Sequence, residues 1–198
     1  DEAGQILRAA FDRHAGLIES NLVVDPGRPT VRKLRFVSEH YSSHLLRADW
    51  EVAASVPAEV ESALIERMQA ALPRAHAVVL SDYAKGTLTP RLIRMTIDSA
   101  RRLGKVVVVD PKGLDFSIYR GATLITPNRK ELGEASHRPV RDLAELDAAA
   151  AELQRTVESD AVLVTLSEDG MLLKIAGAES VHVPAYPVRV RDVSGAGD

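Results

Sequence analysis

The sequence of 198 residues contains no cysteine, which excludes a disulfide framework and any metal site built on thiolates. Its six histidines are scattered without the spacing typical of metal ligands. Apolar runs such as Val106–Val109 are far shorter than the roughly 20 residues that cross a membrane as a helix. The formal net charge of -3 provides no general excess of positive charge for nucleic-acid binding. We therefore expect a cytoplasmic protein that binds neither nucleic acid nor a membrane.

The composition is that of a folded globular protein, with 45% hydrophobic and 27% charged residues. A chain of this length can bury one sizeable core, so we predict a single domain over residues 1–198. The chain opens in an expected helix over residues 1–14 and closes where another helix should begin. We therefore expect this domain to be incomplete at both ends.

Residues 28–50 are predicted to form a small β appendage. Alternating residues predict strands at Thr30–Val37 and His44–Asp49, which can pair as a hairpin, and a separate short strand is expected at Asn21–Val24. The appendage is rich in cations, namely Arg28, Arg32, Lys33, Arg35 and Arg47. Charged residues protect exposed edge strands from aggregation, and that explanation stays open for most of them. We assign Arg47 to phosphate binding, because a planar guanidinium suits a phosphate.

From Pro57 onward, predicted helices alternate with predicted strands. Helix starts are expected at Pro57, Thr89 and Asp142. Buried strands are expected at 75–80, 106–109, 122–126 and 161–166, followed by strands at 171–175, 181–183 and 188–190. This order predicts an α/β fold whose sheet is mostly parallel and finishes antiparallel or mixed.

Each of the four buried strands is followed by a polar cluster. The clusters are Ser81–Gly86, Asp110–Gly113, Pro127–Glu131 and Thr165–Gly170. Open α/β sheets bind ligands at the carboxyl ends of their strands, so we expect one composite site along that edge.

The last residues are expected to form a turn in which glycines flank an alanine and an aspartate follows. Backbone N–H groups of Gly195, Ala196 and Gly197 can approach an anion closely, and Asp198 can accept a proton there. Phosphoryl transfer requires this combination of anion stabilisation and a base. The alternative is an ordinary surface turn. Asn128 and Glu131 can organise Mg²⁺ through water, or they can serve as a capping box at a helix start.

These segments resemble a known family. Residues 192–198, Asp-Val-Ser-Gly-Ala-Gly-Asp, are similar to the signature of the ribokinase-like (PfkB) carbohydrate kinases, and Asn128–Glu131 matches the Asn-x-x-Glu motif of that family. More narrowly, residues 79–86, 110–113 with 119–123, and 126–128 resemble the D-glycero-β-D-manno-heptose-7-phosphate kinases. The resemblance implies a three-layer αβα sandwich in which the β appendage is a lid over the sugar and commonly a contact between two copies.

The resemblance also implies ATP, Mg²⁺ and a reaction. The γ-phosphate would pass to the anomeric hydroxyl of heptose 7-phosphate, giving heptose 1,7-bisphosphate for lipopolysaccharide precursor synthesis. Asp198 would be the base, and residues on the nucleotide side would be Asn128, Glu131, Thr165, Ser167 and Gly170. Ser167 stands where many relatives have glycine. Candidate residues for the sugar and its phosphate are Arg47, Asp82, Lys85, Asp110 and Lys112.

Three other functions stay open at this point. The protein could be a kinase for another sugar or for a nucleoside, which would share the ATP site and differ in the sugar pocket. It could be a regulatory module that binds ligands without turnover, against which the intact Asp198, Asn128 and Glu131 argue. It could also be one half of a bifunctional protein with a nucleotidyltransferase module.

Overall fold

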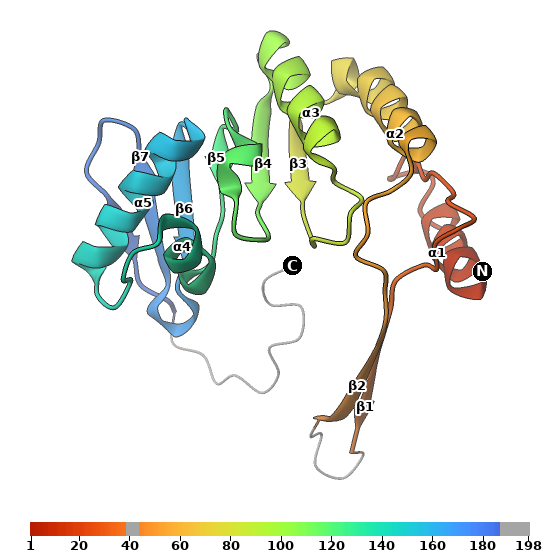
Figure 1. The fold of residues 1–198 in the computed structure, drawn as a ribbon, viewed down its shortest axis with the longest axis horizontal. Coiled ribbons are helices and arrows are strands. Elements are labelled where there is room, and N and C mark those ends of the chain that lie inside the picture. The colour runs from red at the N-terminus through yellow and green to blue at the C-terminus, as the bar shows by residue number, and fades with distance from the viewer. Residues whose placement is uncertain (39–43, 187–198) are drawn as a thin grey trace. The chain divides into compact units, whose positions relative to one another are not determined.

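The computed structural model describes residues 1–38 and 44–186. The chain divides into two compact units (Figure 1). The first unit comprises Asp1–Ala75 and Asp82–Ser99, and the second comprises His76–Ser81 and Ala100–Asp198. The predicted strand at 188–190 and the turn that ends in Asp198 lie outside the described residues.

The first unit contains helices and one hairpin. Its elements are α1 (Glu2–Asp12), β1 (Arg32–Val37), β2 (His44–Trp50), α2 (Ala58–Ala71), the 3-10 turn η1 (Leu72–Arg74) and most of α3 (Pro90–Arg102). Helix α3 begins as predicted, because the Thr89 hydroxyl accepts a hydrogen bond from the Leu92 backbone N–H at 3.1 Å. Pro57 is the residue that immediately precedes α2.

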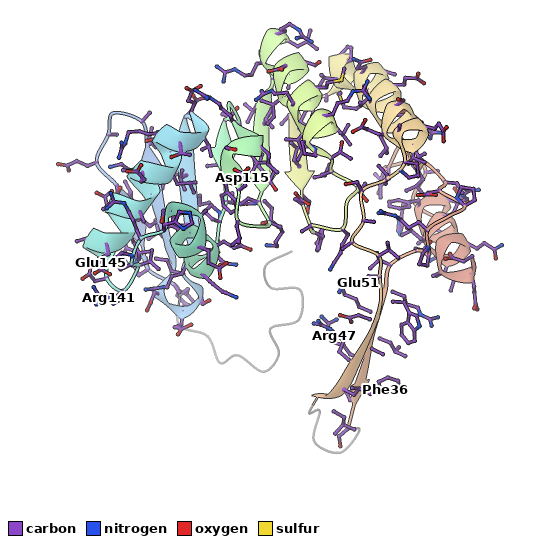
Figure 2. The ribbon with its side chains drawn as sticks, in the orientation of Figure 1. Phe36, Arg47, Glu51, Asp115, Arg141 and Glu145 are labelled. Carbon is purple, nitrogen blue, oxygen red and sulfur yellow. The ribbon has the colours of Figure 1, made fainter. Side chains whose placement is uncertain are left out.

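The hairpin of β1 and β2, which we call the lid, is antiparallel as predicted. Residues directly opposite each other in such a pair point to the same face. One face is largely apolar and carries Arg32, Leu34, Phe36, Leu46, Ala48 and Trp50. The other face carries the charged residues Lys33, Arg35, Arg47 and Asp49. Figure 2 shows Phe36 and Arg47 on the two sides of the ribbon.

The second unit is built on a six-stranded sheet with the order β3-β4-β5-β6-β7-β8. Its strands are β3 (Ala77–Ser81), β4 (Val106–Asp110), β5 (Leu124–Ile125), β6 (Ala161–Thr165), β7 (Met171–Ile175) and β8 (Val181–Val183). Strands β3 to β6 are parallel, and β7 and β8 are antiparallel additions. The sheet therefore ends as mixed, as the sequence predicts.

Two helices and two short 3-10 turns complete this unit. They are η2 (Phe116–Tyr119), α4 (Arg129–Ser136), α5 (Leu143–Val157) and η3 (Ser167–Asp169). Helix α5 contacts β6 and β7, as Figure 1 shows, and its apolar side chains Leu146 and Leu153 are buried. The predicted cap is present, because the Asp142 carboxylate accepts a hydrogen bond from the Glu145 N–H at 2.9 Å.

The two faces of this sheet differ in burial. Val107 and Val109 of β4 and Val162 of β6 are fully buried, and each such side chain contributes about 1.5–3 kcal/mol to stability. The opposite face carries Val79 and Val106, which are 68% and 44% exposed. The sheet core therefore lies on one face, and α5 covers it at β6 and β7.

The predicted fold class is confirmed, with a mostly parallel sheet, flanking helices and a small separate hairpin. The predicted strand at Asn21–Val24 is wrong, since the structure has no regular element there. One of its backbone carbonyls, that of Leu22, accepts a hydrogen bond from the Arg67 side chain at 2.8 Å. Among the residues described, no helix is long and apolar enough to cross a membrane.

Candidate active site

Asn128 and Glu131 form a complete capping box at the start of α4. The Asn128 side chain accepts a hydrogen bond from the Glu131 N–H at 2.9 Å, and Glu131 Oε2 accepts one from the Asn128 N–H at 2.8 Å. The capping alternative from the sequence is thus confirmed as local geometry. It orients the two side chains without using Glu131 Oε1.

Glu131 Oε1 is bound by Lys112, which follows β4. The Lys112 ammonium lies 2.5 Å from this oxygen and 3.6 Å from the Asp110 carboxylate. Partial burial lowers the pKa of Lys112, but the hydrogen bond with Glu131 and the charges of Glu131 and Asp110 outweigh it, and the pKa is raised above the ordinary lysine value. We call Asp110, Lys112, Asn128 and Glu131 the cap centre.

The end of β6 lies beside the cap centre. Thr165 pairs with Asn128 in a parallel bridge, and its N–H donates a hydrogen bond to the Pro127 carbonyl at 3.0 Å. Ser167 has a φ of 54°, which is the left-handed conformation that glycine adopts most easily. Ser167 thus has the backbone conformation that a glycine at this position would adopt without strain. Gly170 closes this turn with a hydrogen bond from its N–H to the Ser167 carbonyl at 3.1 Å.

Arg129 ties this turn to α4, a role that the sequence analysis missed. Its guanidinium lies 2.5 Å from the Asp169 carboxylate and donates a hydrogen bond to the Val140 carbonyl at 3.1 Å. A cation at the first position of a helix is disfavoured by the helix dipole. That unfavourable position is the sequence signal that Arg129 has a partner elsewhere in the fold.

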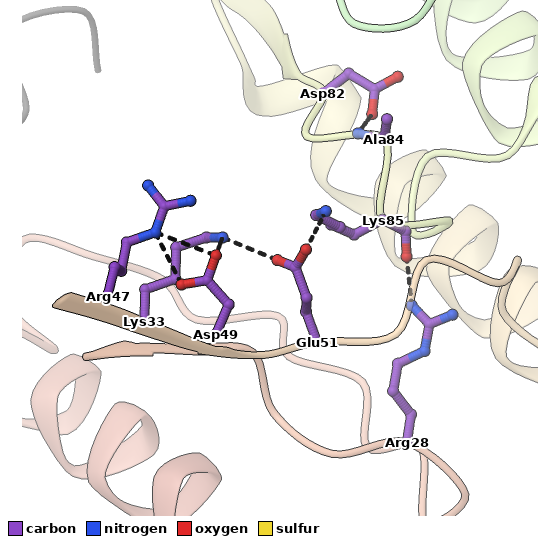
Figure 3. A network of polar contacts seen from close by, with 8 residues as sticks. All are labelled: Arg28, Lys33, Arg47, Asp49, Glu51, Asp82, Ala84 and Lys85. Carbon is purple, nitrogen blue, oxygen red and sulfur yellow. Dashed lines mark hydrogen bonds and ion pairs between the residues drawn. The ribbon is translucent and has the colours of Figure 1, made fainter. Parts of the chain in front are cut away.

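The remaining predicted residues belong to the first unit. Asp82 is buried, with 6% exposure, and its carboxylate accepts a hydrogen bond from the Ala84 N–H at 2.8 Å. Lys85 lies three residues further on, and its ammonium contacts Glu51 at 2.5 Å. Arg28 donates hydrogen bonds to the carbonyls of Lys85, at 2.7 Å, and of Ala54 (Figure 3). These contacts attach the loop to the chain segments immediately before and after the lid.

Glu51 is a second residue that the sequence analysis missed. Its carboxylate joins Lys85 to Lys33, whose ammonium lies 2.8 Å from Glu51 and 3.2 Å from Asp49. Hydrogen bonds from Lys33 and Lys85 hold the pKa of Glu51 below its ordinary value. We call Lys33, Asp49, Glu51 and Lys85 the lid-base network. Arg47 joins it through Asp49, at 2.9 Å (Figure 3).

The predicted residues thus fall into two described groups. One group, in the second unit, contains Asp110, Lys112, Asn128, Glu131, Thr165, Ser167 and Gly170. The other group, in the first unit, contains Arg47, Asp82 and Lys85. The predicted base Asp198 and the turn of Gly195, Ala196 and Gly197 lie outside the described residues.

No cluster of three or more metal-binding histidine, cysteine, aspartate or glutamate side chains occurs within residues 1–38 and 44–186. The oxygens of Asn128 and Glu131 are nevertheless of the kind that Mg²⁺ prefers, and a carboxylate oxygen that already accepts one hydrogen bond can accept another. These two residues fit a magnesium ion held through water. The cationic groups beside them suit an anionic ligand.

Comparisons with known proteins identify chains that are similar to this one. A family model described as pfkB family carbohydrate kinase matches residues 1–198. The "Bifunctional protein HldE" of Rhodopseudomonas palustris (strain BisA53) is 57% identical over the whole chain, which spans 40% of that relative's length.

Solved structures share the fold at low identity. The ribokinase of Giardia lamblia has a TM-score of 0.77 at 21% identity, with 100% of this chain and 61% of that one covered. A ribokinase of Arabidopsis thaliana complexed with ribose and ATP has a TM-score of 0.63 at 18% identity, with 86% and 53% covered. At this identity, the likeness shows the fold alone.

Proposed function

Because the chain belongs to the pfkB family of carbohydrate kinases, we propose that the protein transfers the γ-phosphoryl group of ATP to a sugar hydroxyl. The observation that carries this proposal is the cap centre, where the Asn-x-x-Glu motif, a lysine and the end of β6 lie together. Such a site combines oxygen ligands for a cation with positive charge for phosphates. Phosphoryl transfer depends on this kind of positioning and charge stabilisation.

We propose heptose 7-phosphate as the acceptor and its anomeric hydroxyl as the nucleophile, giving heptose 1,7-bisphosphate for ADP-heptose and lipopolysaccharide synthesis. The support is the resemblance of the segments that include Asp82–Gly86 and Asp110–Gly113, together with 57% identity over the whole chain to a protein named HldE. Arg47, Lys85 and Lys112 are the proposed cations for the sugar phosphate, and Asp82 and Asp110 are the proposed contacts to the sugar.

The proposed nucleotide residues are Asn128, Glu131, Thr165, Ser167 and Gly170, with ATP and Mg²⁺ as cofactors. When bound, the metal ion would neutralise charge on the phosphates. Asn128 and Glu131 would hold it through water, with their side chains fixed by the capping box. The turn from Thr165 to Gly170 would follow the phosphates, held beside α4 by the Arg129–Asp169 ion pair.

Asp198 is the proposed base, and the N–H groups of Gly195, Ala196 and Gly197 form the proposed anion hole. In the full-length protein, we expect Asp198→Asn to preserve ATP binding while it lowers turnover by about 10² to 10⁴, the usual range for a general base. ADP release and calorimetric ATP binding measure the two quantities. Activity within a few-fold of the parent would remove Asp198 from the mechanism.

Assembly and location are proposed with the same function. The family match covers both units, and we propose that both belong to one kinase domain with the lid over the sugar. The lid's apolar face exposes Phe36 by 46% and Leu46 by 62%, which suits burial against a second copy. We propose a cytoplasmic homodimer, which sedimentation of the full-length protein tests.

The experiment that tests the substrate is ADP release by the full-length protein across phosphorylated and unphosphorylated heptoses, pentoses and nucleosides. We expect the highest kcat/KM for heptose 7-phosphate. A preference for an unphosphorylated sugar or a nucleoside would identify a different kinase of this family. Binding of ATP and sugar without ADP release would identify a regulatory module.

A further inference from the structure

The two strands of the lid place one arginine directly opposite another. Arg35 of β1 and Arg47 of β2 are register partners, so their side chains leave the same face of the ribbon. Like charges in directly opposite positions destabilise an antiparallel pair. A bound anion between the two guanidinium groups would convert this repulsion into attraction.

The other cations on this side of the lid already have carboxylate partners. Lys33 contacts Asp49 and Glu51, and Lys85 contacts Glu51. Within the part of the chain that the structure describes, Arg35 makes no ion pair or hydrogen bond. Lys33, Lys85 and Arg47 thus share the two carboxylates of Asp49 and Glu51, and Arg35 adds a further positive charge beside Arg47.

Arg47 is held in a way that keeps part of its guanidinium available. Its Nε lies 2.9 Å and 3.1 Å from the two oxygens of Asp49. Its two terminal nitrogens donate to no other group of residues 1–38 and 44–186, and Figure 3 shows them turned away from Asp49. Asp49 therefore orients Arg47 from one side and leaves the outer edge of its planar fork for a ligand.

A hollow of about 290 Å³ lies at this pair, and it is lined by Arg35, Leu45, Leu46 and Arg47. A water molecule occupies about 30 Å³ in the liquid, so the space can hold a phosphate group with several waters. The hollow has no acidic lining residue. The carboxylate beside it, that of Asp49, is already paired with Arg47 and Lys33.

We propose that Arg35 and Arg47 form a clamp for a phosphate monoester, namely the phosphate that the sugar substrate already carries. The inference rests on the proposed function and deepens it, because it makes Arg35 a residue that selects phosphorylated sugars. Arginine suits this role, since its fork binds phosphate oxygens in pairs. Lys33 and Lys85, which are bound by carboxylates, contribute charge at longer range.

The test uses Arg35→Gln in the full-length protein, with calorimetric binding of heptose 7-phosphate and of the same sugar without phosphate. A charge-assisted hydrogen bond pair is worth about 10- to 100-fold in affinity, so we expect a loss of that size for the phosphorylated sugar. The affinity for the unphosphorylated sugar should not change. Arg35→Lys should recover part of the loss, because it restores charge without the fork.

Arg32→Gln is the matched control. Arg32 lies on the same strand but on the opposite face, 4.4 Å from the centre of the Trp50 ring. The Arg32→Gln variant should bind the phosphorylated sugar with the same affinity as the parent protein. Equal losses in the Arg32 and Arg35 variants would show that the ribbon, rather than the clamp, was damaged, and would overturn the proposal.

Competition between inorganic phosphate and the sugar phosphate tests the clamp without catalysis. Its result can therefore be distinguished from a failure of the kinase proposal. If the parent releases no ADP from any sugar, yet phosphate monoesters bind in an Arg35-dependent way, the clamp stands and the kinase proposal fails. If the parent turns over heptose 7-phosphate and Arg35→Gln has the parent's Kd, the clamp fails alone. A parent that binds no phosphate monoester would overturn the clamp directly.

Discussion

The cap centre and the lid-base network both pair lysines with carboxylates, but they are held in different ways. In the cap centre, the side chains of Asn128 and Glu131 each accept a hydrogen bond from the other residue's backbone N–H group, and these two bonds do not involve Lys112. In the lid-base network, Glu51 is held by the side chains of Lys33 and Lys85. The first arrangement is preorganised, whereas the second depends on contacts that a ligand can replace.

The central carboxylate of the cap centre is also less exposed to solvent than that of the lid-base network. The Glu131 side chain is 13% exposed, compared with 24% for Glu51. Ion pairs in contact with water contribute little net stability and exchange partners readily. The cap centre is therefore fixed by the local fold, whereas the lid-base network is held by more exposed contacts between side chains.

The largest effect should come from adding a methyl group where the backbone has no space for it. Gly86, next to the lid-base network, and Gly170, at the end of the β6 turn, would each place a Cβ 2.1 Å from a carbonyl oxygen, of Ala54 and Val183 respectively. Both also have positive φ. We expect Gly86→Ala and Gly170→Ala to lower the free energy of unfolding by about 3 kcal/mol, measured by urea denaturation.

Gly113→Ala is the control for this pair, since Gly113 has a φ of 90° but nothing within 4 Å of the added Cβ. It should cost only about 1–2 kcal/mol, the price of the left-handed conformation. If the region around the lid-base network can rearrange more easily, Gly86→Ala will lower the free energy of unfolding by less than Gly170→Ala does. The reverse order would contradict the comparison.

Replacing Lys112 of the cap centre and Lys85 of the lid-base network by methionine should show which substrate each region binds. Lys112→Met removes both the partner of Glu131 and a proposed cation for the sugar phosphate, so we expect kcat/KM for ATP to fall about tenfold or more and KM for the sugar phosphate to rise. Lys85→Met should raise KM for the sugar phosphate by a similar factor and leave KM for ATP unchanged. Steady-state kinetics with each substrate varied in turn measures both.

Lys130→Met provides the matched control, because Lys130 lies on α4 with an 82% exposed side chain and a 3.7 Å contact to Glu134. The Lys130→Met variant should have the parent's kcat/KM for ATP and the parent's KM for the sugar phosphate. A rise in KM for the sugar phosphate, with kcat/KM for ATP intact, would assign Lys112 to the sugar phosphate alone and would contradict a role in ATP binding through Glu131.

The sequence predicted the second unit well because its signals are local. Asp142 caps α5 by accepting a hydrogen bond from the N–H group three residues further on, and Asn128 and Glu131 form a capping box within four residues. The buried strands were found by their apolar runs, with ends correct to within about two residues. The polar residues at the strand ends then followed from the rule for parallel sheets.

The lid-base network could not be predicted in this way. Lys85 finds Glu51 34 residues earlier in the chain, and Arg28 reaches the Lys85 carbonyl across 57 residues. No periodicity specifies such partners, since they depend on how the hairpin meets the loop. The strand predicted at Asn21–Val24 failed for the same reason, because Arg67 of α2 binds the Leu22 carbonyl from 45 residues away.

The smallest effect that we expect is an acid-dependent loosening of the lid. Hydrogen bonds from Lys33 and Lys85 lower the pKa of Glu51, so their stabilisation is complete above about pH 4.5 and is lost as the pH falls through the lowered pKa. Hydrogen exchange of residues 44–50, corrected for its intrinsic pH dependence, should therefore rise below pH 4.5 by less than about fivefold. Glu51→Gln should already exchange faster at neutral pH and should lose this acid step. An unchanged step in that variant would show that another group, and not the Glu51 carboxylate, holds the lid to the loop.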